Sequence, residues 1–141
     1  MKPFFLILLL CLPAHSEILR LSLVVPEAGE GITKFEISRG EIKETIFVKD
    51  QAIVTTADVA EARPSLTRDD SVSVSLTDKG GEKMFEASKA MRHGIDRIAI
   101  ILEGKLISAP VVNDTLGKNF EISGLNEPDE PKKLAARLSG K

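Results

Sequence analysis

The sequence predicts an α+β domain, with an antiparallel or mixed sheet of about five to seven strands and two main helices packed on one face. Short segments with apolar residues at alternate positions recur along the chain, and Gly, Pro or Asp residues separate them. This alternation is typical of half-buried strands joined by turns. Two longer segments, after Thr77 and after Asn126, carry apolar residues three or four positions apart, the spacing of a helix face. Strands and helices grouped in this way form a sheet with helices against it.

The N-terminal segment 1–16 has the composition of a secretory signal peptide, and we expect cleavage before Glu17. Lys2 supplies a positive charge, residues 4–12 are continuously apolar, and Ala14-His15-Ser16 forms a small-residue cleavage motif. The sequence therefore predicts an exported protein, periplasmic or secreted.

Two alternatives exist for this segment: a retained membrane anchor and a lipoprotein signal at Cys11. The apolar run is much shorter than the ~20 residues that a helix needs to cross a bilayer. Leu10 is bulkier than the residue that usually precedes a lipidated cysteine. We therefore expect residues 17–141 to form a single domain with no stable membrane span.

Cleavage would leave a mature chain without a thiol, because Cys11 is the only cysteine. His15 would also be removed, so that His93 is the single remaining histidine. A disulfide framework and a closed zinc site of His and Cys ligands are then excluded. The net charge of −2, with basic residues spread singly, gives no electrostatic case for binding nucleic acid or an anionic membrane.

Several short strands are predicted in the first half of the domain. They lie at 18–25, 35–38, 41–49 and 52–54, with turns or loops at 26–31, 39–40 and 50–51. Thr56 is placed to cap a short helix over 57–60, because its hydroxyl can accept an early helical N–H.

The segment from Val72 onward predicts a strand followed by the best helix of the chain. Residues 72–77 alternate apolar and hydroxyl side chains, and the helix over 78–92 can be capped by Thr77 or Asp78. Gly94 suits the left-handed position that ends a helix. One helix face carries Met84, Ala87, Ser88 and Met91, with Phe85 beside them. This stripe fits core packing, the commoner role, or an adaptable peptide-binding surface.

A three-stranded meander is predicted between residues 98 and 123. The apolar run 98–102 suits a strand buried on both faces, and Glu103-Gly104-Lys105 provides a tight hairpin turn. The return strand, 106–112, contains Pro110 and should lie at a sheet edge or carry a bulge. Residues 120–123 form the third strand. We predict one core that contains Phe85, Ile98, Ile100, Leu102, Ile107, Val111, Phe120, Ile122 and Leu134.

The chain ends in a second predicted helix that Asn126 can cap. Pro128 and Pro131 fit only near its start, Leu134, Ala135 and Leu138 form its apolar stripe, and Gly140 stops it.

No catalytic or metal-binding constellation stands out. Asp69, Asp70 and Asp78 lack the alternating pattern of a calcium loop. His93 falls at a predicted helix end, and no G-x-S-x-G motif presents a serine to it. We expect no catalytic residue, no cofactor and no metal, and therefore a protein that is not an enzyme.

The predicted meander resembles the periplasmic head of SecD, the accessory subunit of the bacterial Sec translocase. The resembling elements are GKLISAPVV, a loop with Gly117, and EISG, in that order. Upstream, residues 55–59 with Ala62-Arg63, and residues 72–77, are similar to further segments of that family. The resemblance covers roughly residues 44–140. It departs from the family at the start of the last helix, where the pair of prolines is not expected.

The resemblance implies a binding module that takes part in protein export and holds an emerging or unfolded polypeptide, or a translocase or envelope partner. It covers the head without the transmembrane bundle that couples to protons. An exposed strand edge or an apolar groove would supply the affinity. The resemblance implies a structural role for the family-motif residues and makes them a candidate partner edge. They are Gly104, Lys105, Ile107, Ser108, Ala109, Pro110, Ile122, Ser123 and Gly124. The alternative is a secreted structural or inhibitory domain that keeps the fold without a transport role.

Overall fold

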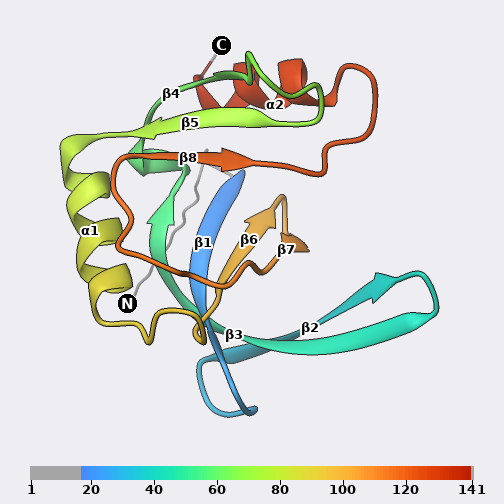
Figure 1. Ribbon diagram of the computed structural model, residues 1–141, viewed down its shortest axis with the longest axis vertical. Helices are drawn as coiled ribbons and strands as arrows, with labels where there is room; N and C mark the ends of the chain where they lie inside the picture. Colours follow the sequence, from blue (N-terminus) through green and yellow to red (C-terminus); the bar gives the residue numbers. More distant parts are fainter. Residues whose placement is uncertain (1–16, 141) are drawn as a thin grey trace, which may run out of the picture.

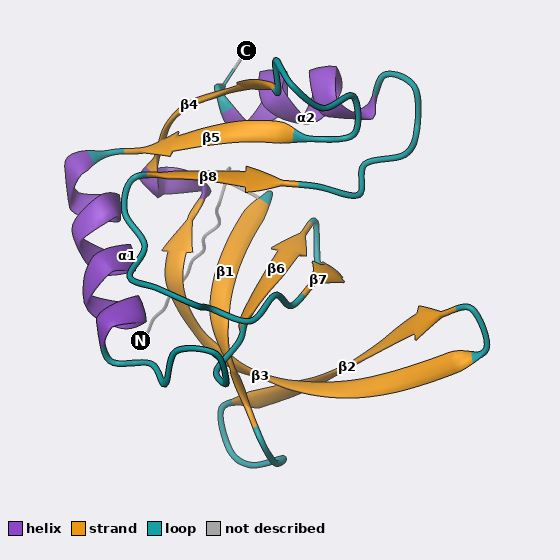
Figure 2. Cartoon of the chain, in the orientation of Figure 1, coloured by secondary structure: helices purple, strands orange, loops and turns teal. Residues whose placement is uncertain are grey.

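The computed structural model describes residues 17–140 and folds them into eight strands, two α-helices and one short 3₁₀ helix (Figures 1 and 2). The α+β class is therefore confirmed, and the predicted signal peptide lies outside the described residues. In chain order the elements are β1 (Leu19–Val25), β2 (Ile32–Arg39), β3 (Ile42–Thr55), η1 (Thr56–Asp58), β4 (Val59–Pro64), β5 (Val72–Leu76), α1 (Asp78–Lys89), β6 (Ile98–Leu102), β7 (Lys105–Ser108), β8 (Asn119–Ile122) and α2 (Glu130–Leu138).

The strands divide between two antiparallel sheets. The larger sheet has the order β2-β3-β1-β6-β7, and the smaller sheet has the order β4-β5-β8. In Figure 1 the smaller sheet and α2 lie at the top, and α1 runs down one side to reach both sheets. The antiparallel pairing of neighbouring strands is confirmed. The sequence pattern did not show that the strands divide between two sheets.

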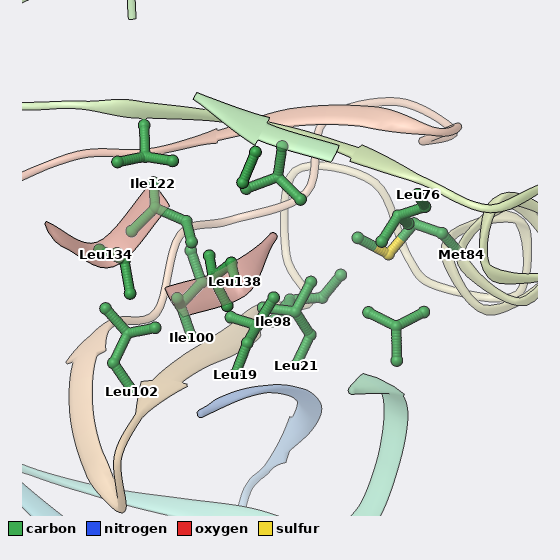
Figure 3. Close-up of a cluster of buried hydrophobic side chains, with 14 of the residues drawn as sticks. Leu19, Leu21, Leu76, Met84, Ile98, Ile100, Leu102, Ile122, Leu134 and Leu138 are labelled. Atoms are coloured by element: carbon green, nitrogen blue, oxygen red, sulfur yellow. The ribbon is translucent and has the colours of Figure 1, made fainter. Parts of the chain in front are cut away.

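The main core lies between the two sheets and is closed by both helices. Figure 3 shows side chains from β1, β5, β6, β8, α1 and α2 that point toward one another. The fully buried residues of the main core include Leu19, Leu21, Leu76, Ile122 and Leu134. Burial of such apolar surface is the main favourable term in folding, about 25 cal/mol per Å².

The larger sheet is apolar on both faces because the hairpin of β2 and β3 folds across its second face. All five residues of β6 are buried, as predicted, and they alternate between two clusters. Ile98, Ile100 and Leu102 face the main core, whereas Ala99 and Ile101 join a second cluster. That second apolar cluster also contains Ile46, Val48 and Ala109, with Val24, Phe35, Ile37 and Leu106 packed against it.

The predicted third strand of the meander is wrong in its partner. β8 pairs with β5 in the smaller sheet, where Phe120 lies opposite Val74 and Ile122 opposite Val72. Alternation along a strand shows which side chains are buried, but it does not show which strand lies next to it. The hairpin turn itself is confirmed, since Glu103 and Gly104 have φ values of 50° and 82°.

Seven of the nine predicted core residues belong to the main core or pack against it, but Phe85 and Val111 do not. Each of these two side chains is 43% exposed. Phe85 lies beside the buried stripe of α1, and the ammonium of Lys89 lies 5.8 Å from its ring centroid. Val111 follows the end of β7, and its neighbour Val112 is the residue that turns inward.

Several predicted turns and caps are displaced. The predicted turn at Asp50-Gln51 is wrong, because β3 runs through it and the Asp50 N–H donates to the Gly31 carbonyl at 2.8 Å. Thr55, not Thr56, caps the 3₁₀ helix. α1 begins after Thr77, whose hydroxyl accepts from the Gly80 N–H, as predicted.

The end of α1 and the start of α2 also differ from the prediction. α1 ends at Lys89, so Gly94, with φ of 84°, belongs to the following loop and does not terminate the helix. α2 begins after Asp129 and not after Asn126. Pro131 lies in the first turn of α2, where its missing N–H leaves no hydrogen bond unmade.

Candidate functional site

The predicted β7 edge exists, but it is short. β7 is the last strand of the larger sheet, as Pro110 indicated, and its register to β6 shifts by one residue around Ile107. Beyond the strand, the Ala109 carbonyl already accepts a hydrogen bond from Arg97 Nε at 2.7 Å. The same guanidinium contacts Glu44 of β3 at 2.8 Å. Little regular backbone is left at this edge for a partner.

The family-motif residues fall in two separate places. Gly104 and Lys105, with 107–110, lie at the hairpin turn and on the β7 edge of the larger sheet. The other three residues, 122–124, lie in and after β8 of the smaller sheet. There Ile122 is buried, Ser123 accepts from the Ser71 hydroxyl at 2.9 Å, and Gly124 has a φ of 86°. The motif residues therefore lie at two positions of the fold and do not form one continuous surface.

A longer free edge lies on the second half of β3, which sequence reasoning missed. β2 pairs only with residues 42–49 of β3, so residues 51–55 have a neighbouring strand, β1, on one side only. The β1 register passes from Leu21–Val54 to Ser22–Ala52, which leaves Ile53 without a partner in that ladder. In Figure 1, α1 runs alongside this half of β3.

A groove separates α1 from β3, and we call it the α1–β3 groove. Its volume is about 410 Å³, within the range of ligand-binding pockets. Its lining residues are Leu23, Lys49, Gln51, Ala52, Ile53, Lys83, Ala87, Ala90, Met91 and Asp96. The groove thus has an apolar floor and a polar rim.

The predicted methionine stripe is mostly core. Met84 is 2% exposed and Ser88 is fully buried, so these positions cannot present a surface. Ala87 and Met91, at the end of the stripe, reach the groove instead. The sequence could have indicated this site only through the combination of an uninterrupted β3 with a helix that ends shortly before Met91.

Two ion pairs lie at the ends of the groove, and one of them joins its two walls. Asp58, which follows β3, accepts from Lys83 Nζ of α1 at 3.1 Å and from the Thr55 N–H at 3.0 Å. At the other end, Asp96 accepts from both the guanidinium and the backbone N–H of Arg92 at 2.8 Å. The Asp58–Lys83 pair therefore links α1 to the end of β3, whereas the Asp96–Arg92 contacts fix the loop that follows α1.

We expect Asp96 to titrate below 3.8, its ordinary value, because the Arg92 guanidinium lowers the pKa of its carboxylate, and the Arg92 N–H lowers it further. A lowered folded-state pKa means that this contact stabilises the fold above the ordinary pKa and is lost as the pH falls through the folded value. NMR titration of the Asp96 carboxylate measures this midpoint. Arg92→Ala should raise it, and an identical midpoint in the variant would contradict the assignment.

The described chain, residues 17–140, contains no helix that is both long and apolar enough to cross a membrane. Within the same residues, no group of three or more His, Cys, Asp or Glu side chains is arranged to hold a metal ion.

The chain is similar to a known protein family and to solved structures. The family model described as SecDF, P1 head subdomain, matches residues 32–141, which confirms the resemblance expected from the sequence. Two similar solved structures are titled "Crystal structure of SecDF in Super-membrane-facing form" and "Structure and function of a membrane component SecDF that enhances protein export". The first has a TM-score of 0.64 and 24% identity, and the second has a TM-score of 0.62 and 21% identity.

These alignments cover 87% of this chain in both cases, but 18% and 62% of the respective solved chains. At this level of identity the likeness shows a shared fold. No match was found among the curated proteins.

Proposed function

The chain belongs to the SecDF P1 head subdomain family, and from this premise we propose that it is an extracytoplasmic binding module associated with protein export. One solved relative is described as a membrane component that enhances protein export. Since this chain spans only part of the solved SecDF chains, the activity of the whole protein enters here as part of the proposal.

The bound species in this proposal is an extended, unfolded polypeptide segment that occupies the α1–β3 groove. The observation that carries the proposal is the combination of a free strand edge, residues 51–55, with a helix beside it across an open groove. A polypeptide can add to such an edge as a further strand, with main-chain hydrogen bonds for affinity and side-chain contacts on the flanking surface. Ile53, unpaired in the β1 ladder, is the natural first contact.

The groove suits a partner with little fixed sequence. Backbone pairing is independent of side chains, and the apolar floor accepts side chains of several shapes because Met91 is unbranched and flexible. Folded proteins have their backbone groups already paired, so they offer few strands to the β3 edge. The site would therefore favour unfolded chains over folded ones.

We further propose that the module acts by binding and not by catalysis. The single histidine of the described residues, His93, has its Nε2 atom 3.0 Å from the Ser88 carbonyl oxygen. This contact anchors the ring at the end of α1 and leaves it no serine nucleophile in hydrogen-bond contact.

The proposal is tested by measuring fluorescence anisotropy of labelled unfolded polypeptides as the chain is added. Ala90→Arg should block the groove, because this exposed residue lines it and a long charged side chain would project into it. We expect binding to weaken about tenfold or more, the loss of at least one favourable contact of about 1.4 kcal/mol. Ala28→Arg, in the exposed loop after β1, adds the same charge away from the groove and should leave binding unchanged.

Equal weakening by both variants would indicate a general charge effect and contradict the assignment of the groove. The absence of binding to every unfolded polypeptide, with folded partners bound instead, would favour the structural or inhibitory alternative. Circular dichroism of both variants verifies that the fold is retained.

A further inference from the structure

The outer edge of β2 is the most regular free strand edge in residues 17–140. Eight consecutive residues of β2 pair with β3 without a register shift, and the strand contains no proline. Within the described residues no strand pairs with its other side. By contrast, β7 and β8 have four residues each, and the Ala62 backbone of β4 is capped on both its N–H and its carbonyl by the Ser139 hydroxyl.

The backbone groups that point outward from β2 can be identified from the ladder. The Asp50 N–H donates to the Gly31 carbonyl, and the register continues through Thr33–Val48 to Arg39–Ile42 at the two-residue turn. Because hydrogen-bonded and non-hydrogen-bonded positions alternate in an antiparallel pair, the odd-numbered residues of β2 bond to β3. The even-numbered residues Lys34, Glu36 and Ser38 therefore direct their N–H and C=O groups away from the sheet.

The exposed side chains of this edge are self-complementary. Lys34 and Glu36 are both exposed and lie on the same face of the strand, two positions apart. A lone lysine on a free edge normally opposes pairing with another chain. When two copies of β2 run antiparallel with Phe35 opposite Phe35, each Lys34 lies directly opposite the Glu36 of the second copy, and opposite charges in such cross-strand pairs stabilise a sheet.

We propose that two copies of this chain associate through β2 and form one continuous sheet about a two-fold axis at Phe35. The charges select this register, and the alternation of the ladder is compatible with it. Placing Lys34 opposite Glu36 pairs even-numbered residues with each other, as the outward backbone groups require. Phe35, half-buried against the second apolar cluster, would gain the second copy's ring as a neighbour.

A second copy fits this edge better than an arbitrary polypeptide. An unrelated strand would need an acidic residue opposite Lys34 and a basic residue opposite Glu36 while running antiparallel to β2. A second copy of β2 supplies both residues. This association uses a different edge from the α1–β3 groove, so it goes beyond the proposed function and does not depend on it.

Sedimentation velocity of the full chain at a series of concentrations tests the proposal. We expect a monomer–dimer equilibrium in the native chain. Lys34→Glu and Glu36→Lys should each raise the dissociation constant about tenfold or more, because two symmetry-related pairs become repulsive. The double variant, K34E with E36K, restores opposite charges and should return the dissociation constant to near the native value.

Two further variants complete the test. Glu36→Pro removes an outward N–H while leaving the ladder with β3 intact, so it should abolish the dimer and keep the fold, as judged by circular dichroism. Lys132→Glu, on the exposed side of α2, is a matched charge reversal that should have no effect. A native chain that stays monomeric, a dimer that persists in Glu36→Pro, or a double variant that fails to recover would overturn the proposal. Loss of unfolded-polypeptide binding in Glu36→Pro without any dimer would assign the β2 edge to polypeptide instead.

Discussion

Replacing Leu21 with Ala is expected to lower the free energy of unfolding by about 2–5 kcal/mol, the range observed when a buried leucine is truncated. Leu21 is 1% exposed and lies on β1, the central strand of the larger sheet. Its side chain lies in the main core among residues of both sheets (Figure 3). The rigid strands on either side cannot collapse into the space, so the cost should fall toward the upper part of this range. Urea denaturation followed by circular dichroism measures the change.

Leu66→Ala is the matched control for this prediction. Leu66 lies in the loop between β4 and β5 and is 92% exposed, so the same truncation removes almost no buried surface. Its free energy of unfolding should stay within about 0.5 kcal/mol of the native value. Similar losses at both positions would mean that the main core is not organised around β1.

Gly80→Ala is expected to destabilise the protein by about 1–3 kcal/mol, although Ala is normally the better helix residue. A Cβ atom at Gly80 would lie 2.9 Å from Asp58 Cβ, 3.1 Å from the Asp58 carbonyl oxygen and 3.2 Å from Leu76 Cβ. The Asp58 carbonyl also accepts the Thr77 N–H at 2.8 Å, so the backbone there cannot move freely. The close approach of α1 to the end of β3 therefore requires glycine.

Gly81→Ala, one residue later, should behave differently. A Cβ atom there would meet Lys118 Cγ at 2.4 Å, and this half-exposed side chain can rotate away at the expense of its exposed pair with Asp78. We expect a change within about 1 kcal/mol of the native stability, since the gain in helix propensity offsets the lost contact. Equal destabilisation by both substitutions in urea denaturation would contradict the distinction between backbone and side-chain obstruction.

Much of the local structure followed from the sequence for identifiable physical reasons. The apolar run of β6 predicted burial on both faces, and the alternation of β5 predicted its inward valines. Thr77 predicted the start of α1, because a hydroxyl at that position satisfies a free helical N–H. These features depend on residues close together in the chain, which is the information that a sequence pattern contains.

The candidate site could not be predicted because it depends on long-range neighbours. Asp50 has the character of a turn residue, yet its N–H is paired to Gly31, so β3 continues and leaves residues 51–55 without β2 beside them. Similarly, the residues of β8 show alternation in either sheet, and only the tertiary contact with Val72 and Val74 decides which sheet it joins. The groove depends on the first of these long-range pairings, because residues 49 and 51–53 of β3 line it.

The position of β1 between β3 and β6 also has a consequence for how the chain acquires its structure. Leu21 pairs with Val54 on one side and with Ile100 on the other, so the first strand of the domain is completed only by a strand from near the end of the chain. The entropy cost of closing such long loops comes before the non-local contacts form, and this slows folding. During synthesis from the N-terminus, the larger sheet cannot be completed until β6 is available. Until then the edge of β1 that pairs with β6 has no neighbouring strand, and the time between the synthesis of β1 and that of β6 decides how long this edge stays unpaired.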